Sequence, residues 1–211
     1  MSHQVDASFN DAELAPTETA GYRVGEKKSL AEYLQADAED ESLARWKASL
    51  GLPAAAAGGA SSSSSKGPGL TLHWLGLQSA GAPNGGQITL DLEEYLKGGE
   101  EARENMKKNP IVIKEGVTYN IAISFSVGAD VLSGLKYLHV VKRAGVTVDK
   151  YEEMIGSYGP AATPYKKSCP AEEAPSGMLA RATYAVRSRI VDDDKTVWAD
   201  FTWYFKIAKD W

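Results

Sequence analysis

The stretch that decides the fold is VTYNIAISFSV, residues 117–127. Its side chains alternate, so that one face carries Val117, Tyr119, Ile121, Ile123, Phe125 and Val127, and the other Thr118, Asn120, Ala122, Ser124 and Ser126. A period of two with one apolar face is typical of a β-strand that packs on a core. The stretch therefore predicts a half-buried strand.

The same alternation recurs between this stretch and the C-terminus. It predicts strands at 134–143, 178–190 and 198–207, with shorter ones at 70–78, 87–92, 111–113 and 146–149. Turn signals separate these runs: Lys114–Gly116, Ala144-Gly145, 156–160 and 192–195. The charged insert 93–108 interrupts the strands with one expected helical turn. Many short alternating strands indicate an all-β fold, an antiparallel sandwich.

The first 52 residues differ sharply from the rest. They hold the whole formal charge of −5 and few large apolar side chains. We expect residues 1–21 to be disordered. Two short helices follow, one beginning at Ser29 with a capping box to Glu32, the other at Asp40 with Leu43 and Trp46 on one stripe. The pattern leaves open whether these helices pack on the chain's own sandwich or on a second protein.

Residues 53–69, PAAAAGGASSSSSKGPG, have the composition of a flexible linker. A coil of this length spans on the order of 20–25 Å. The predicted organisation is an acidic arm at 1–52, a linker at 53–69 and a β-domain at 70–211.

Composition and motifs disfavour several classes of function. The first residues lack the basic and apolar pattern of a signal peptide, so we expect none. No run of ~20 apolar residues is present, and the acidic chain lacks the basic cluster that nucleic acid binding needs. Neither His73 nor His139 has a neighbouring metal-ligand pattern, Cys169 has no evident His partner, and Asp192–Asp194 lacks the spacing of a calcium loop. We therefore expect no enzyme activity, no metal and no cofactor.

Seven short strings then suggest a family. DESL at 40–43, KEGV at 114–117, SGLKY at 133–137, GSYGP at 156–160, EEAPSGMLARATY at 172–184, SRIVDDDK at 188–195 and KDW at 209–211 occur in one order. Together they resemble the Rho GDP-dissociation inhibitor family over residues 22–52 and 70–211. The linker, the loop at 79–87 and the 98–108 insert depart from the commoner members.

The resemblance implies an immunoglobulin-like sandwich with a flexible, partly helical N-terminal arm. It also implies a cytoplasmic protein that binds prenylated Rho-family GTPases as a 1:1 heterodimer, preferring the GDP-bound form. Such a protein slows GDP release, holds the geranylgeranyl chain between its sheets and extracts the GTPase from membranes, with only transient membrane contact.

Site residues carried over by this resemblance fall into three groups. The arm residues expected on the GTPase switch regions are Ser29, Asp40, Leu43 and Trp46. The expected prenyl-binding residues are Ile111, Tyr119, Val131, Val186 and Trp203, with Leu75 or Leu77. The acidic surface expected to face the basic tail of the GTPase comprises Asp149, Glu172, Glu173 and Asp194.

Two alternatives remain open on sequence grounds. A prenyl-binding carrier of the phosphodiesterase-delta type would not need a switch-gripping arm, which the DESL string disfavours. A plain adhesion-like sandwich would fill its core with Trp74, Tyr119, Phe125, Trp203 and Phe205. A cavity between the sheets would separate the lipid carriers from the filled sandwich.

Overall fold

The computed structural model describes residues 9–17, 41–42, 45, 69–128 and 131–211. The strands are β1 (Leu70–Gln78), β2 (Gln87–Asp91), β3 (Ile111–Lys114), β4 (Thr118–Val127), β5 (Leu132–Arg143), β6 (Val146–Tyr158), β7 (Tyr165–Glu173), β8 (Thr183–Val191) and β9 (Val197–Ala208). The helical elements are η1 (Asp11–Leu14), α3 (Pro83–Gly86), α4 (Leu92–Lys97) and α5 (Gly99–Lys108).

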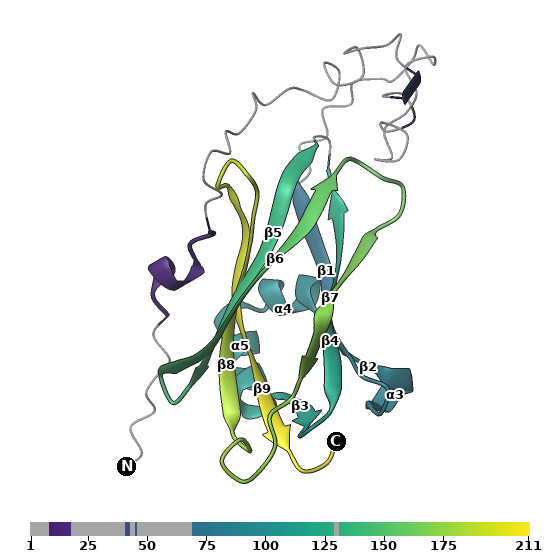
Figure 1. Cartoon of the computed structure of the whole chain (residues 1–211). Coiled ribbons are helices and arrows are strands. Elements are labelled where there is room, and N and C mark those ends of the chain that lie inside the picture. Colours follow the sequence, from purple (N-terminus) through teal and green to yellow (C-terminus); the bar gives the residue numbers. More distant parts are fainter. Residues whose placement is uncertain (1–8, 18–40, 43–44, 46–68, 129–130) are drawn as a thin grey trace.

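The strands form two sheets packed face to face, as Figure 1 shows. One sheet has the order β2-β1-β4-β7 and the other the order β3-β9-β8-β5-β6. The predicted all-β sandwich is confirmed. Within the described strands, β3 departs from the antiparallel expectation, because it pairs with β9 in parallel.

The core lies between the sheets, where the central strands turn their apolar faces inward. On β4, Ile121, Ile123 and Phe125 are buried, as the alternation predicts, and Ala122 and Ser124 on the other face are buried as well. Phe125 packs edge-on against Tyr158 of β6, with ring centroids 4.9 Å apart, a geometry that aromatic pairs prefer.

Three strands differ from the sequence expectation. β8 begins at Thr183 instead of residue 178, β6 runs to Tyr158 instead of stopping near residue 149, and β7 was not predicted at all. β7 is an edge strand with the sequence YKKSCPAEE, in which Cys169 alone is buried, so it shows no apolar alternation. Pro170 fits there because an edge strand tolerates a missing N–H donor.

The insert after β2 forms two helices, α4 and α5, where one helical turn was expected. Asp91 caps α4 by accepting a hydrogen bond from the Glu94 N–H at 2.9 Å. Leu92 and Tyr95 on α4 and Met106 on α5 are buried, and the Tyr95 hydroxyl donates to the Thr202 carbonyl of β9. The insert is therefore anchored on the sandwich.

The expected disorder of residues 1–21 is wrong for residues 9–17. These residues form η1 and run along the outer side of β5, β6 and β8, where Figure 1 draws them in purple. Leu14 is 1% exposed and packs against Leu138, Val140 and Val191. The surface that orders this segment comes from strands far away in sequence, so local composition does not reveal it.

The predicted arm helices lie mostly outside the described residues. Ser29, Asp40, Leu43 and Trp46 all fall there, as do residues 53–68 of the linker. Of the predicted second helix, Glu41, Ser42 and Arg45 are helical. In the described part of the chain, no helix is long and apolar enough to cross a membrane.

Candidate functional site

A cavity of about 630 Å³ lies between the two sheets. Its exposed lining residues come mainly from β6 and β7, each an edge strand of one sheet; examples are Val148, Asp149 and Glu173. The mouth of the cavity therefore lies between β6 and β7. Most of the lining is apolar: Leu77, Ile113, Ile121, Val141, Val148, Pro170, Ala171, Ala174, Pro175, Tyr184, Val186, Trp203, Phe205 and Ile207. The size falls in the range of small-molecule sites.

A buried polar network holds the Trp203 ring in the cavity wall. The Trp203 Nε1–H donates to Ser188 Oγ at 2.9 Å, and Ser188 Oγ lies 2.9 Å from the Tyr137 hydroxyl. All three side chains are buried. Because the network satisfies the polar edge of the indole, the ring can line an apolar site without an unpaired donor.

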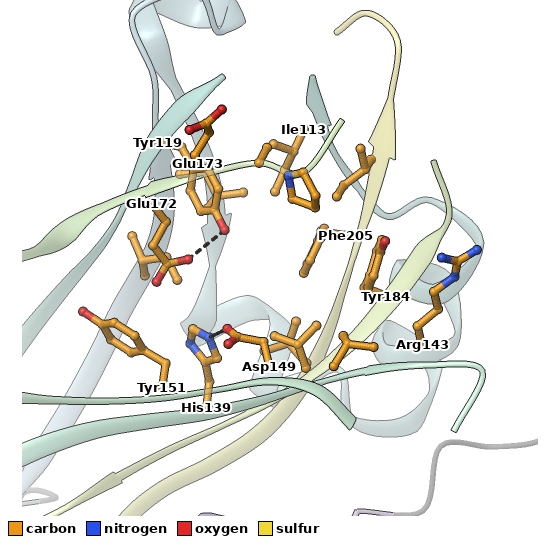
Figure 2. A pocket seen from close by; sticks show the side chains of 18 of the residues that line it. Ile113, Tyr119, His139, Arg143, Asp149, Tyr151, Glu172, Glu173, Tyr184 and Phe205 are labelled. Atoms are coloured by element: carbon orange, nitrogen blue, oxygen red, sulfur yellow. Dashed lines mark hydrogen bonds and ion pairs between the residues drawn. The ribbon is translucent and has the colours of Figure 1, made fainter. Parts of the chain in front are cut away.

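A second wall is aromatic. The rings of Tyr184 and Phe205 stack with centroids 4.9 Å apart and planes 10° apart. The Tyr184 hydroxyl donates to the Ala180 carbonyl at 2.7 Å, which ties the wall to the loop after β7. Figure 2 shows both rings and Arg143 at one end of the cavity.

The other end of the cavity is polar, as Figure 2 shows. The Tyr119 hydroxyl donates to Glu172 Oε2 at 2.9 Å, and burial followed by the Glu172 charge raises the Tyr119 pKa. His139 Nε2 lies 3.7 Å from Asp149 Oδ2, and this contact lowers the Asp149 pKa. Carboxylates therefore flank the mouth on both edge strands.

Comparisons with known proteins agree on one family. The family model described as RHO protein GDP dissociation inhibitor matches residues 7–210. The Rho GDP-dissociation inhibitor of Schizosaccharomyces pombe is 42% identical over 188 residues, covering 89% of this chain and 86% of that protein. Rho GDP-dissociation inhibitor 1 of Homo sapiens is 41% identical over 194 residues, covering 92% and 88%. The chain belongs to the Rho GDP-dissociation inhibitor family.

A further relative is similar over much of its length. Rho GDP-dissociation inhibitor 3 of Bos taurus is 41% identical over 190 residues, covering 90% of this chain and 78% of that protein. The match to the family model spans the arm, the linker and the sandwich alike. The match to the family therefore covers the whole chain organisation and not the sandwich alone.

The structure brings together four of the residues that the family resemblance assigned to prenyl binding. Leu77, Tyr119, Val186 and Trp203 line the cavity. Ile111 and Val131 are not among its lining residues. Ile111 is a core residue of β3, and Val131 is half-buried just before β5.

The family's acidic surface is divided in this structure. Asp149, Glu172 and Glu173 line the cavity at its mouth. Asp194 is exposed on the turn between β8 and β9 and is not a lining residue.

Several lining residues were missed by sequence reasoning. Ile113 lies two positions after Ile111, so the strand period places both on one face, and only the structure shows which one reaches the cavity. The sequence shows no metal-ligand pattern around His139 and gives no reason to single out Tyr151, yet both line the polar end. Their rings stack with centroids 5.1 Å apart, a pairing across β5 and β6 that sequence alone does not reveal.

Two of the strings that carry the family resemblance meet at one turn. Gly134 of SGLKY has φ +60°, and a Cβ there would lie 2.0 Å from Asp193 Oδ2. Asp192 accepts from the Thr196 N–H at 2.8 Å and from the Trp198 Nε1–H at 2.9 Å. The aspartate run thus shapes a turn, and no metal-binding group of His, Cys, Asp or Glu occurs among the described residues.

Proposed function

We propose that this member of the family binds prenylated Rho-family GTPases in their GDP-bound form, slows GDP release and shields the geranylgeranyl chain in the cavity. The observation that carries this proposal is the apolar cavity of about 630 Å³ between the sheets. In this proposal residues 1–52 act as the arm, 53–69 as the linker and 70–211 as the prenyl-binding domain.

The cavity would stabilise the bound prenyl chain, but it cannot by itself extract the GTPase from a membrane. Moving a prenyl chain from water into apolar surroundings contributes about 0.8 kcal/mol per buried CH₂ group. A bilayer offers the chain a similar gain, so the cavity alone does not favour removal from a membrane. Contacts between the two proteins must supply the surplus, and we assign the larger part to the arm.

The acidic mouth of the cavity suits the basic tail of the GTPase, which carries the prenyl chain. A basic GTPase tail is attracted to an anionic membrane by about 1 kcal/mol per Lys or Arg. When the tail leaves the membrane it loses this attraction. The carboxylates at the mouth, Asp149, Glu172 and Glu173, would offset that loss once the prenyl chain is in the cavity. Asp149 is charged at neutral pH, and the contact with His139 lowers its pKa further.

The arm accounts for the effect on nucleotide. Ser29, Asp40, Leu43 and Trp46 are proposed to contact the GTPase switch regions. An arm that binds the GDP-bound switch geometry more tightly than the empty one must slow GDP loss, because the coupling between two binding events is reciprocal. The resulting 1:1 complex would be cytoplasmic, with only transient membrane contact.

The alternatives fit less well. A filled adhesion-like sandwich has no use for a cavity whose aromatic walls are held in place by hydrogen bonds. A prenyl carrier of the phosphodiesterase-delta type would share the cavity but not the effect on nucleotide. Nucleotide release therefore decides between the two lipid-binding functions.

The deciding experiment follows release of labelled GDP from a prenylated Rho GTPase, beside extraction of that GTPase from liposomes. The intact protein should slow release and extract the GTPase. Asp40→Ala should lose part of both effects, because a charged hydrogen bond is worth about 1.5–3 kcal/mol. Asp37→Ala is the matched control for arm charge and should act as the intact protein. Lipid binding without any slowing of release would support the carrier function instead.

A further inference from the structure

The outer faces of β5 and β8 carry a basic and apolar surface that the cavity does not use. We call it the outer-face site. It consists of four cations around three apolar side chains: Lys136, Lys142, Arg187 and Arg189 around Leu138, Val140 and Val191. Residues 9–17 lie on this site, and each of their polar anchors meets a partner of matching chemistry.

Asp11 makes the first anchor. Its Oδ1 lies 2.7 Å from Arg187 Nη1 and 3.0 Å from Arg189 Nη2. Asp200 of β9 holds the same two guanidinium groups from the other side, at 2.7 Å and 2.6 Å. Both arginines thus present a fixed pair of donors to an incoming carboxylate.

Glu13 makes the second anchor. Its carboxylate lies 2.8 Å from Lys142 Nζ and accepts a hydrogen bond from Thr147 Oγ1 at 2.6 Å. The Lys142 side chain is only 7% exposed and also lies over the Phe9 ring, 5.1 Å from its centroid. Lysine is rarely buried unless paired, so a carboxylate at this position is part of what lets Lys142 lie there.

Leu14 and Thr17 complete the fit. Leu14 fills the apolar centre of the site against Leu138, Val140 and Val191. Thr17 donates to Glu152 Oε2 from its backbone N–H at 2.9 Å and from its hydroxyl at 2.8 Å. Lys136 Nζ donates to the Thr17 carbonyl at 2.9 Å.

We propose that the outer-face site is a binding surface for an acidic peptide segment bearing a buried leucine, and that residues 9–17 occupy it as a clasp that positions the arm. The chemistry is selective. Two carboxylates meet three of the cations, and Leu14, with Phe9 packed beside it, meets the apolar centre.

The clasp bears on the arm through chain connectivity, and this step rests on the proposed function. Thr17 is held at β5 and β6, and β1 begins at Leu70, so the chain between them has both ends fixed on the sandwich. Anchoring one end of a flexible segment near its target raises its effective concentration there. Undocking the clasp should therefore weaken arm contacts without touching the cavity.

The test uses the full-length chain with Leu14→Ala, and Leu90→Ala as a control, since Leu90 is a half-buried leucine of β2 in the other sheet. Amide hydrogen exchange across residues 9–17 should become at least tenfold faster in Leu14→Ala and stay unchanged in Leu90→Ala. A labelled peptide of residues 9–17 should bind the Leu14→Ala chain saturably, and a scrambled peptide should not. Unchanged exchange, or equal binding of both peptides, would overturn the proposed site.

Function is read out separately. Leu14→Ala should slow GDP release from a prenylated Rho GTPase less strongly than the intact chain, while its affinity for a prenylated peptide stays the same. If exchange rises but inhibition is unchanged, the positioning role is wrong although the site stands. If the intact chain neither binds the prenylated peptide nor slows GDP release, the proposed function is wrong. The exchange rates and the binding of the 9–17 peptide still decide whether the outer-face site exists.

Discussion

Replacing Trp203 by alanine should separate lipid binding from protein binding. The indole is 2% exposed and lines the cavity. Because the ring is already shielded from water, the lipid gains packing contacts with it and not new burial. About ten atom contacts at roughly 0.1–0.2 kcal/mol each would make the loss about 1–2 kcal/mol, which corresponds to a roughly tenfold weaker Kd.

The same change will also cost stability. Truncating a buried Trp to Ala destabilises by about 3–5 kcal/mol, which lies at or below the usual total of 5–15 kcal/mol for a domain. We therefore expect a folded sandwich with a lower Tm. Trp198→Ala is the matched control, because Trp198 is a half-buried Trp on the same strand that does not line the cavity.

The assay compares affinity for a prenylated Rho GTPase with affinity for the same GTPase lacking its prenyl chain. Trp203→Ala should weaken the first about tenfold and leave the second nearly unchanged, and Trp198→Ala should change neither. An equal loss for both GTPase forms would place Trp203 in the general core and refute its assignment to the lipid site.

Three further outcomes can be measured. Lys142, then Thr147, lowers the Glu13 pKa from 4.5 to about 2, so the clasp gains full support from Glu13 above pH 4.5 and loses it as the pH falls toward 2. The protection of residues 9–17 from amide exchange, relative to an unstructured peptide at the same pH, should fall over that window. Glu13→Gln should remove the Glu13 part of this pH dependence and leave the part from Asp11, whose pKa Arg189 and Arg187 also lower. Burial raises the Cys169 pKa to about 11, so alkylation at pH 8 should be at least about 100-fold slower than for a free thiol and become fast on denaturation. Deleting residues 1–52 should retain binding of a prenylated peptide but lose most inhibition of GDP release. If the shortened protein slows GDP release as strongly as the intact protein, the arm is not what slows it.

The fold was predictable where burial follows the strand period. The sequence of β4 alternates strictly and the strand was predicted to within one residue at its start, although Ala122 and Ser124 on its polar face are also buried. β7 was missed because an edge strand exposes most of its side chains and carries no period of apolar residues. The helices of the insert were underestimated, since their few buried residues, such as Leu92 and Met106, are anchored by strands elsewhere in the chain.

The candidate site was predictable in part, and for a similar reason. Alternation and the family resemblance point to Tyr119, Val186 and Trp203 as inward residues, and all three line the cavity. Whether an inward residue fills the core or borders a void depends on how the two sheets are spaced, as Ile111 and Ile113 show. The docking of Leu14 depends on strands more than a hundred residues away, so no local pattern could predict it.

The place of β9 in its sheet bears on how the protein is made. β9 is the last strand of the chain, yet it lies between β3 and β8, and it pairs in parallel with a strand almost a hundred residues earlier. Contacts of such large sequence separation slow folding, and a chain still emerging from the ribosome lacks β9 altogether. Because Trp203, Phe205 and Ile207 all belong to β9, the cavity wall and the closed sheet must form in the same late step. A nascent chain would thus leave β3 and β8 with unpaired edges until β9 has been made, so removing β9 would take away the cavity wall together with the strand that joins the two.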